Sequence, residues 1–236
     1  MSQFLAAFTV FIALHSVPAV PRIRGALVSR LGHGTYIAAY SAVSLVALAW
    51  LFYAAFNVDY FELWTPAAWQ GWVTFVAAPI GLFLVLAGLL SRNPFSTTAR
   101  RGGGEPGAIV AVTRHPVLWG FLLWALGHVP PNGDLRSLLL FGGFAAFTAG
   151  SIAMMEKRNR KKYGPGWTTR IEATSIIPFQ AILQKRVRLR IDGPVVFAFV
   201  AAVASVAWLL LGGHAWLFGG DPLLFVRSLQ AASIVP

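Results

Sequence analysis

Apolar positions gather into six runs that are separated by short polar stretches. The runs cover approximately residues 3–20, 36–56, 68–90, 116–131, 135–155 and 194–218. A helix needs about 20 residues, at about 1.5 Å each, to cross the hydrocarbon core of a membrane. The pattern therefore predicts six transmembrane helices. The fourth run is short and ends at the sequence VPPNG, so we expect it to form a tight hairpin with the fifth.

Composition supports a membrane protein. Hydrophobic residues make up 57% of the 236 positions and charged residues 11%, whereas soluble domains contain about 45–50% apolar and about 25% charged residues. We predict an all-α integral membrane bundle that forms a single domain over residues 1–236, because no loop is long enough for a soluble domain. The chain has no cysteine, which excludes disulfides, zinc sites with cysteine ligands and iron–sulfur clusters.

The net charge of +11 lies in alternate loops. Loops 21–35 and 91–115 each carry +3 and loop 156–193 carries +7, whereas the intervening loops and the C-terminal tail are neutral or acidic. The positive-inside rule then places these three loops in the cytoplasm and both termini outside the cytoplasmic membrane. The bilayer as partner accounts for the cations, so we expect no nucleic-acid binding.

No Lys or Arg precedes the first run, so the sequence does not predict a cleavable signal peptide there.

Loop 156–193 mixes apolar and basic residues. The stretch 176–183 is rich in Ile, Phe and Leu, and Lys185, Arg186, Arg188 and Arg190 follow it. Such a mixture suits the surface of an anionic leaflet. We expect this segment to lie along the inner membrane surface.

Five histidines are the main candidates for chemistry. His15 lies inside the first run, where an ionisable residue is costly and is usually functional or paired internally. A neutral ring bonded to a backbone carbonyl or to Ser16 is an equally good explanation. His33 and His214 are expected to be loop or interfacial residues.

Two histidines bracket the sequence TRHPVLWGFLLWALGH at residues 113–128. Pro116 suits the first helical position, so Thr113 or His115 is expected near the cap of the helix. Capping or contact with lipid headgroups would explain His115 simply. Arg114 could pair with an anionic group or a phospholipid. His128 is 13 residues from His115, which corresponds to about 220° and about 20 Å along a helix. One straight helix therefore cannot bring both rings to the same metal ion.

Common enzyme motifs are absent from the sequence. It contains no HExxH zinc motif, no Walker loop and no dinucleotide fingerprint, and its Ser, His and Asp residues follow no known triad order. The glycines at 102–104 stand before Glu105-Pro106-Gly107 and not between a strand and a helix. They indicate a connector and not a phosphate-binding loop.

Several segments together resemble the NnrU family of bacterial membrane proteins. They are His15-Ser16, the sequence TRHPVLWGFLLWALGH, the NGD at 132–134, LLLFGGFAAF and GPGWTTRIEATSIIPF. The likeness covers about residues 3–180 and is most specific over 113–147. The NnrU family is similar to plant zeta-carotene isomerase, a membrane haem b protein. The resemblance implies a role in denitrification and nitrogen-oxide metabolism, or an isomerase-like haem protein with a hydrophobic small-molecule substrate. The haem-binding histidines of the isomerase lie in segments that match His15 and His128.

A more distant likeness is to membrane methyltransferases of the isoprenylcysteine type. It rests on Arg114-His115-Pro116, Gly120, Glu156, Tyr163-Gly164 and Ile177-Pro178. In those enzymes the Arg-His-Pro stretch and a Glu at the end of the following helix hold S-adenosylmethionine, so here Arg114, His115 and Glu156 would bind that cofactor. A carboxylate suits its ammonium group and a cation suits its carboxylate. Because Lys157 and Arg158 follow Glu156, however, the simpler expectation is a solvated helix end.

The leading hypothesis is a haem b whose iron is ligated by His15 and His128. With the predicted topology, His15 lies about 16 Å and His128 about 12 Å below the outer surface, at about 1.5 Å per residue. Two neutral imidazoles at matched depth on different helices are what a bis-histidine haem requires. Arg22, Arg24 or Arg114 would meet the haem propionates if that edge points inward. The alternatives are a methyltransferase and a non-catalytic membrane factor.

Overall fold

The computed structural model describes residues 1–17, 20–100 and 104–232. The described residues are helical apart from connecting segments, with a single isolated bridge between Glu62 and Asp134 and no strand. The protein is therefore all-α, as the hydrophobic pattern predicts. By internal contacts the chain divides into two compact units: unit 1 contains residues 1–63 and 134–140, and unit 2 contains residues 64–133 and 141–236.

Unit 1 is built on a pair of apolar helices. Helix α1 (Ser2–Ser16) and helix α3 (His33–Phe56) pack along each other, and α2 (Pro21–Leu31) joins them. Phe4 and Ala7 of α1 are buried, as are Ala47 and Leu51 of α3. The basic loop expected at 21–35 thus contains a helix, which begins with a proline in its first turn.

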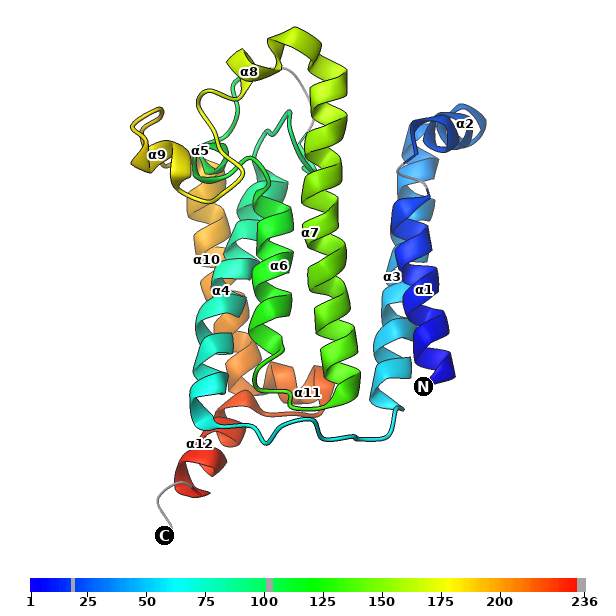
Figure 1. Cartoon of the computed structure of the whole chain (residues 1–236), viewed down its shortest axis with the longest axis vertical. Coiled ribbons are helices and arrows are strands. Elements are labelled where there is room, and N and C mark those ends of the chain that lie inside the picture. Colours follow the sequence, from blue (N-terminus) through cyan, green and yellow to red (C-terminus); the bar gives the residue numbers. More distant parts are fainter. Residues whose placement is uncertain (18–19, 101–103, 233–236) are drawn as a thin grey trace. The chain divides into compact units, whose positions relative to one another are not determined.

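Unit 2 is organised around helix α4 (Ala68–Leu90), which packs against α6 (Pro116–His128) and α10 (Gly193–Trp208). Helix α7 (Leu135–Tyr163) begins in unit 1 and supplies unit 2 from Phe141 onward. Short helices lie at the two ends of these long ones (Figure 1). At one end are α5 (Ile109–Val112), α8 (Trp167–Arg170) and α9 (Gln180–Leu183), and at the other are α11 (His214–Phe218) and α12 (Pro222–Ala232).

Small residues let α4 and α6 approach closely. A Cβ on Gly81 would lie 2.6 Å from the carbonyl oxygen of Gly120, and one on Gly120 would lie 2.5 Å from the carbonyl oxygen of Gly81. A Cβ on Gly88 would lie 2.8 Å from Cγ of Pro116. Contacts between small residues are typical of helices in lipid, where close packing replaces the hydrophobic effect. They hold the first turn of α6, and the residues just before it, against α4.

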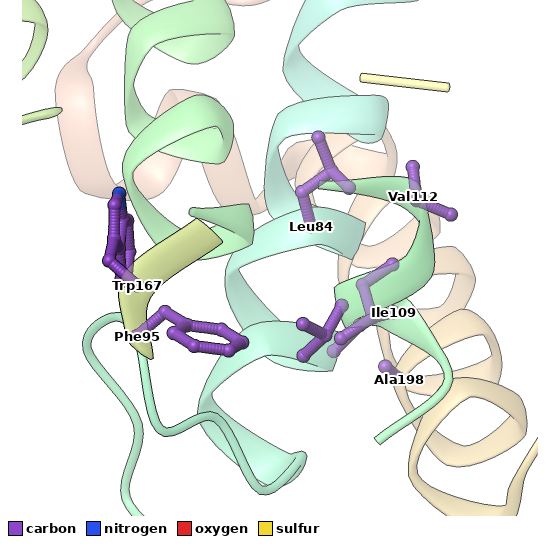
Figure 2. Packing of buried hydrophobic residues seen from close by; sticks show 8 residues of the cluster. Leu84, Phe95, Ile109, Val112, Trp167 and Ala198 are labelled. Carbon is purple, nitrogen blue, oxygen red and sulfur yellow. The ribbon is translucent and has the colours of Figure 1, made fainter. Parts of the chain in front are cut away.

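The apolar core of unit 2 lies near its α5–α8–α9 end. Figure 2 shows Leu84, Phe95, Ile109, Val112, Trp167 and Ala198 in this cluster, and Val110 and Ala87 complete it. The edge of Phe95 meets the ring of Trp167, with centroids 5.8 Å apart. Loop residues, and not only helix faces, therefore close this end of the unit. We call it the basic end, because residues 91–100, 104–115 and 156–192 form it and carry most of the positive charge.

Four helical segments are long and apolar enough to cross a membrane: His33–Phe56, Ala68–Leu90, Leu135–Arg170 and Gly193–Phe218. Ser2–Ser16 and Pro116–His128 are apolar but shorter. Many large apolar side chains point outward, for example Val196, Phe197, Phe199, Val200 and Val203 of α10. An exposed apolar surface of this extent requires lipid. The chain is an integral membrane protein, and each of the six predicted runs overlaps one of these helical segments.

Candidate functional site

The Arg114-His115-Pro116 stretch is fixed by its backbone. The Arg114 N–H donates to the carbonyl oxygen of Ser175 at 2.9 Å, and its own carbonyl accepts from the side-chain amide of Asn93 at 3.0 Å. Pro116 is the first residue of α6, as predicted, and of the two expected cap candidates His115 is the N-cap residue. The His115 side chain makes no capping hydrogen bond, so its imidazole is available for other contacts.

The His115 ring bonds to Glu156. Nε2 of His115 donates to Oε1 of Glu156 at 2.8 Å, and Nε of Arg114 lies 3.6 Å from the same oxygen. The three residues are 0%, 7% and 5% exposed, respectively. The expectation of a solvated helix end at Glu156 and of a headgroup-contacting His115 is therefore wrong. Helix α7 continues for two turns beyond Glu156, and its other faces carry Lys157 and Arg158.

Burial sets the charges of this cluster. Burial lowers the pKa of His115 below its usual 6.5, against the opposing effect of Glu156, so the ring is neutral at pH 7. Burial also lowers the pKa of Arg114, and Glu156 opposes this shift. An arginine remains a cation under these conditions. The cluster thus combines one cation, one carboxylate and a neutral imidazole that donates through Nε2.

Six buried side-chain atoms at the basic end have no hydrogen-bond partner among the described residues. They are Oγ of Ser91, Oγ of Ser96, Nε and Nη1 of Arg114, Nδ1 of His115 and Nε1 of Trp167. The Arg114 guanidinium also lies 5.5 Å from the centroid of the Trp167 ring. A buried polar atom without a partner costs about 1–3 kcal/mol. Such a concentration marks the basic end as a place where a polar ligand would be stabilised.

His15, in unit 1, is held by its own helix. Its Nδ1 donates to the carbonyl oxygen of Phe11 at 2.8 Å. Its ring lies 4.2 Å from that of Phe11 and 6.0 Å from that of Tyr40, between centroids. Because a carbonyl can only accept, the neutral ring carries its proton on Nδ1 and its lone pair on Nε2.

His128, in unit 2, has the same arrangement. Its Nδ1 donates to the carbonyl oxygen of Trp124 at 2.7 Å, so its lone pair is also on Nε2. The ring stacks on Phe141 at 5.0 Å and lies 5.0 Å from the Trp124 ring. His15 and His128 belong to different units, and a shared iron stays a prediction.

The remaining histidines lie at helix ends. His33 is the first residue of α3 and is exposed. His214 begins α11, and its Nδ1 donates to the carbonyl oxygen of Gly220 at 2.6 Å. Among the described residues, no three His, Cys, Asp or Glu side chains gather closely enough to hold a metal ion together.

Some residues of the basic end have no signal in a single sequence. Asn93 bonds the backbone of Arg114, and Asn159 donates to the carbonyl oxygen of Phe95 at 2.6 Å. Both asparagines are buried, although each stands next to arginines in the sequence. An uncharged residue inside a basic run is a weak hint of burial. Trp167 gives a stronger one, because a large aromatic ring directly after a Gly-Pro-Gly turn needs a partner surface.

Comparison with known proteins gives one match. No curated protein and no solved structure matches the chain. The model of the family described as "NnrU protein" matches residues 3–222, which is nearly the whole chain. The described helices, the outward-facing apolar side chains and this match together show that the chain is a membrane protein of the NnrU family.

Proposed function

We propose that this NnrU-family protein is an integral membrane haem protein that binds haem b through His15 of α1 and His128 of α6. The likeness to zeta-carotene isomerase supports an isomerase-like activity on a hydrophobic substrate that reaches the site from the bilayer. A redox-related role in nitrogen-oxide metabolism is the other activity that the likeness implies.

The tautomer of the two histidines is the observation that carries this proposal. Each ring donates from Nδ1 to the carbonyl four residues earlier, at 2.8 Å for His15 and 2.7 Å for His128. A hydrogen bond of this kind orients a ligating imidazole and puts its lone pair on the other nitrogen. Both histidines therefore fit the chemistry of an axial haem ligand that binds through Nε2.

Aromatic neighbours add to the fit. Phe11 and Tyr40 lie beside His15, and Trp124 and Phe141 lie beside His128. Flat apolar side chains keep water from the rings. When bound, haem would supply an iron centre for redox or Lewis-acid chemistry. The residues of this chain would orient the ligands and exclude water.

The test is the absorption spectrum of the full-length protein, purified in detergent from cells supplied with haem. We expect a Soret band with low-spin character that is lost in His15→Ala and in His128→Ala. His33→Ala is the matched control, because His33 is an exposed histidine at a helix start, and its spectrum should equal that of the parent protein. A parent protein without a Soret band would overturn the proposal, as would an unchanged spectrum in either of the first two variants.

A second candidate is an S-adenosylmethionine-dependent membrane methyltransferase, favoured by the contact of Arg114 and His115 with Glu156. These are the residues that the methyltransferase likeness assigns to the cofactor. Nε and Nη1 of Arg114 have no hydrogen-bond partner among the described residues and suit the carboxylate of that molecule. Glu156 suits its ammonium group.

Calorimetry separates this candidate from the first. Titration of the parent protein with S-adenosylmethionine should give a binding isotherm that Arg114→Gln removes. The control is Arg158→Gln, which removes the same charge from a half-buried arginine of α7, two residues after Glu156. Absence of both a Soret band and an isotherm would favour a non-catalytic membrane factor.

A further inference from the structure

A second feature of the basic end is a cavity of about 460 Å³ that is separate from the histidines. It lies between the end of α4, the turn before α5 and the start of α10. Its walls include Ser91, Arg92, Arg100, Gly107, Arg190 and Asp192. Three arginines thus border one cavity, although Arg190 is far from the other two in the sequence.

The acidic residues of the cavity are already engaged. Oδ2 of Asp192 accepts from the backbone N–H of Ala108 at 2.8 Å, and Oδ1 accepts from that of Val195 at 3.1 Å. Glu105 lies 3.7 Å from Arg190, but its side chain is 88% exposed, and an exposed pair contributes little. Within the described residues, Arg92 and Arg100 have no acidic group at ion-pair distance. The cavity therefore has an excess of positive charge.

A buried hydroxyl points to a polar ligand. Ser91 is 1% exposed and lines the cavity, and its Oγ has no hydrogen-bond partner among the described residues. The neighbouring wall is Gly107, where a Cβ would lie 2.9 Å from that Oγ and 2.7 Å from Cβ of Ser91. A side chain at 107 would thus crowd the hydroxyl. The cavity thus combines the hydroxyl of Ser91 with the guanidinium groups of Arg92, Arg100 and Arg190.

We propose that this cavity binds the phosphate of an anionic phospholipid. A phosphate offers several acceptor oxygens to guanidinium forks and to a hydroxyl. A lipid is favoured over a soluble phosphate by the surroundings of the cavity. Leu189 and Ile191, on either side of Arg190, are 58% and 74% exposed. Pro194 of the lining lies in the first turn of α10, whose outward face is apolar.

The geometry gives the lipid a defined position. Its headgroup occupies the cavity and its acyl chains run along the exposed side chains of α10, which suits an amphiphile at a membrane surface. The loop charges assign the basic end to the cytoplasmic side, where anionic lipids face it. This site is independent of the haem proposal, since it uses none of the histidines.

The experiment measures lipid binding to the full-length protein in detergent by native mass spectrometry. The probes are phosphatidic acid, phosphatidylcholine of the same chains, and inorganic phosphate. We expect phosphatidic acid to bind more tightly than phosphatidylcholine, and the double variant Arg92→Gln/Arg100→Gln to weaken phosphatidic acid binding by about tenfold or more. Ser91→Ala should weaken it by a smaller factor.

Arg188→Gln is the matched control. It removes the same charge from an exposed arginine of the same basic end that does not line the cavity, and it should change binding less than twofold. Equal weakening by the control would overturn the site and indicate general attraction to a basic surface. Displacement of phosphatidic acid by millimolar inorganic phosphate would overturn the lipid as ligand. Arg92, Arg100 and Arg188 are exposed, so we expect the variants to fold like the parent protein. Unchanged circular dichroism spectra would exclude unfolding as the cause of weaker lipid binding.

Discussion

Replacement of Gly120 by alanine tests the close packing of α4 and α6. The added Cβ would lie 2.5 Å from the carbonyl oxygen of Gly81, 2.7 Å from Cγ2 of Val85 and 2.8 Å from the backbone nitrogen of Val85. Two of these three atoms are backbone and cannot rotate away. The helices would have to separate by several tenths of an ångström, along the contact that positions the first turn of α6.

The magnitude follows from two opposing effects. Overpacking costs about 1–3 kcal/mol, and the backbone contacts put Gly120→Ala near the upper value. Alanine is a better helix former than glycine, which returns about 1 kcal/mol. We therefore expect a net loss of about 2 kcal/mol in the free energy of unfolding.

The assay is unfolding in mixed micelles by increasing mole fractions of sodium dodecyl sulfate, followed by circular dichroism. The matched control is Gly150→Ala in α7, where nothing lies within 4 Å of the added Cβ. This control should be as stable as the parent protein, or up to about 1 kcal/mol more stable. If Gly120→Ala were as stable as Gly150→Ala, the close approach of the two helices would be wrong.

Three further predictions concern the basic end and the orientation. Glu156→Gln should lower the free energy of unfolding by about 3–5 kcal/mol, because it leaves a buried cation without its carboxylate, whereas exposed Glu172→Gln should change it by less than about 0.5 kcal/mol. Because burial lowers the pKa of His115, the imidazole of the unfolded chain becomes protonated at a higher pH than that of the folded chain. Thermal stability in detergent should therefore fall as the pH drops below about 6.5, and should fall less in His115→Gln. Reporter fusions after Gly104 and after Asp192 should both be cytoplasmic, and an external signal from either would contradict the topology.

The long helices could be predicted because their signal is local. A run of about 20 apolar residues has few alternatives to a membrane-spanning helix, and α3, α4 and α10 begin within three residues of the predicted runs. The helix at Pro21–Leu31 could not be predicted in this way, because its sequence is basic and short. Its contacts are with α3, and a single sequence does not show them.

The burial of Glu156 could not be predicted because the two residues that follow it in the sequence are cations. Lys157 and Arg158 follow Glu156, but successive helical residues point about 100° apart. One face of α7 can therefore bury a carboxylate while the next two positions face outward. The partner that decides the matter, His115, is 41 residues away in the sequence. The prediction of a shared iron between His15 and His128 depends on the same kind of long-range information.

Loop charge alone does not separate the arginines of the basic end by role. Arg114 and Arg92 belong to the same loop, which carries +3, and both count equally toward orientation. Burial distinguishes them: Arg114 is enclosed beside its own carboxylate, whereas Arg92 is exposed beside a cavity and has no acidic partner within the described residues. An enclosed ion pair suits a stabilising role or a zwitterionic ligand, and an unpaired cation suits an anion. The double variant of Arg92 and Arg100 removes two charges and leaves that loop at about +1. The positive-inside bias is therefore retained, so a loss of lipid binding in this variant would reflect the cavity and not an inverted topology.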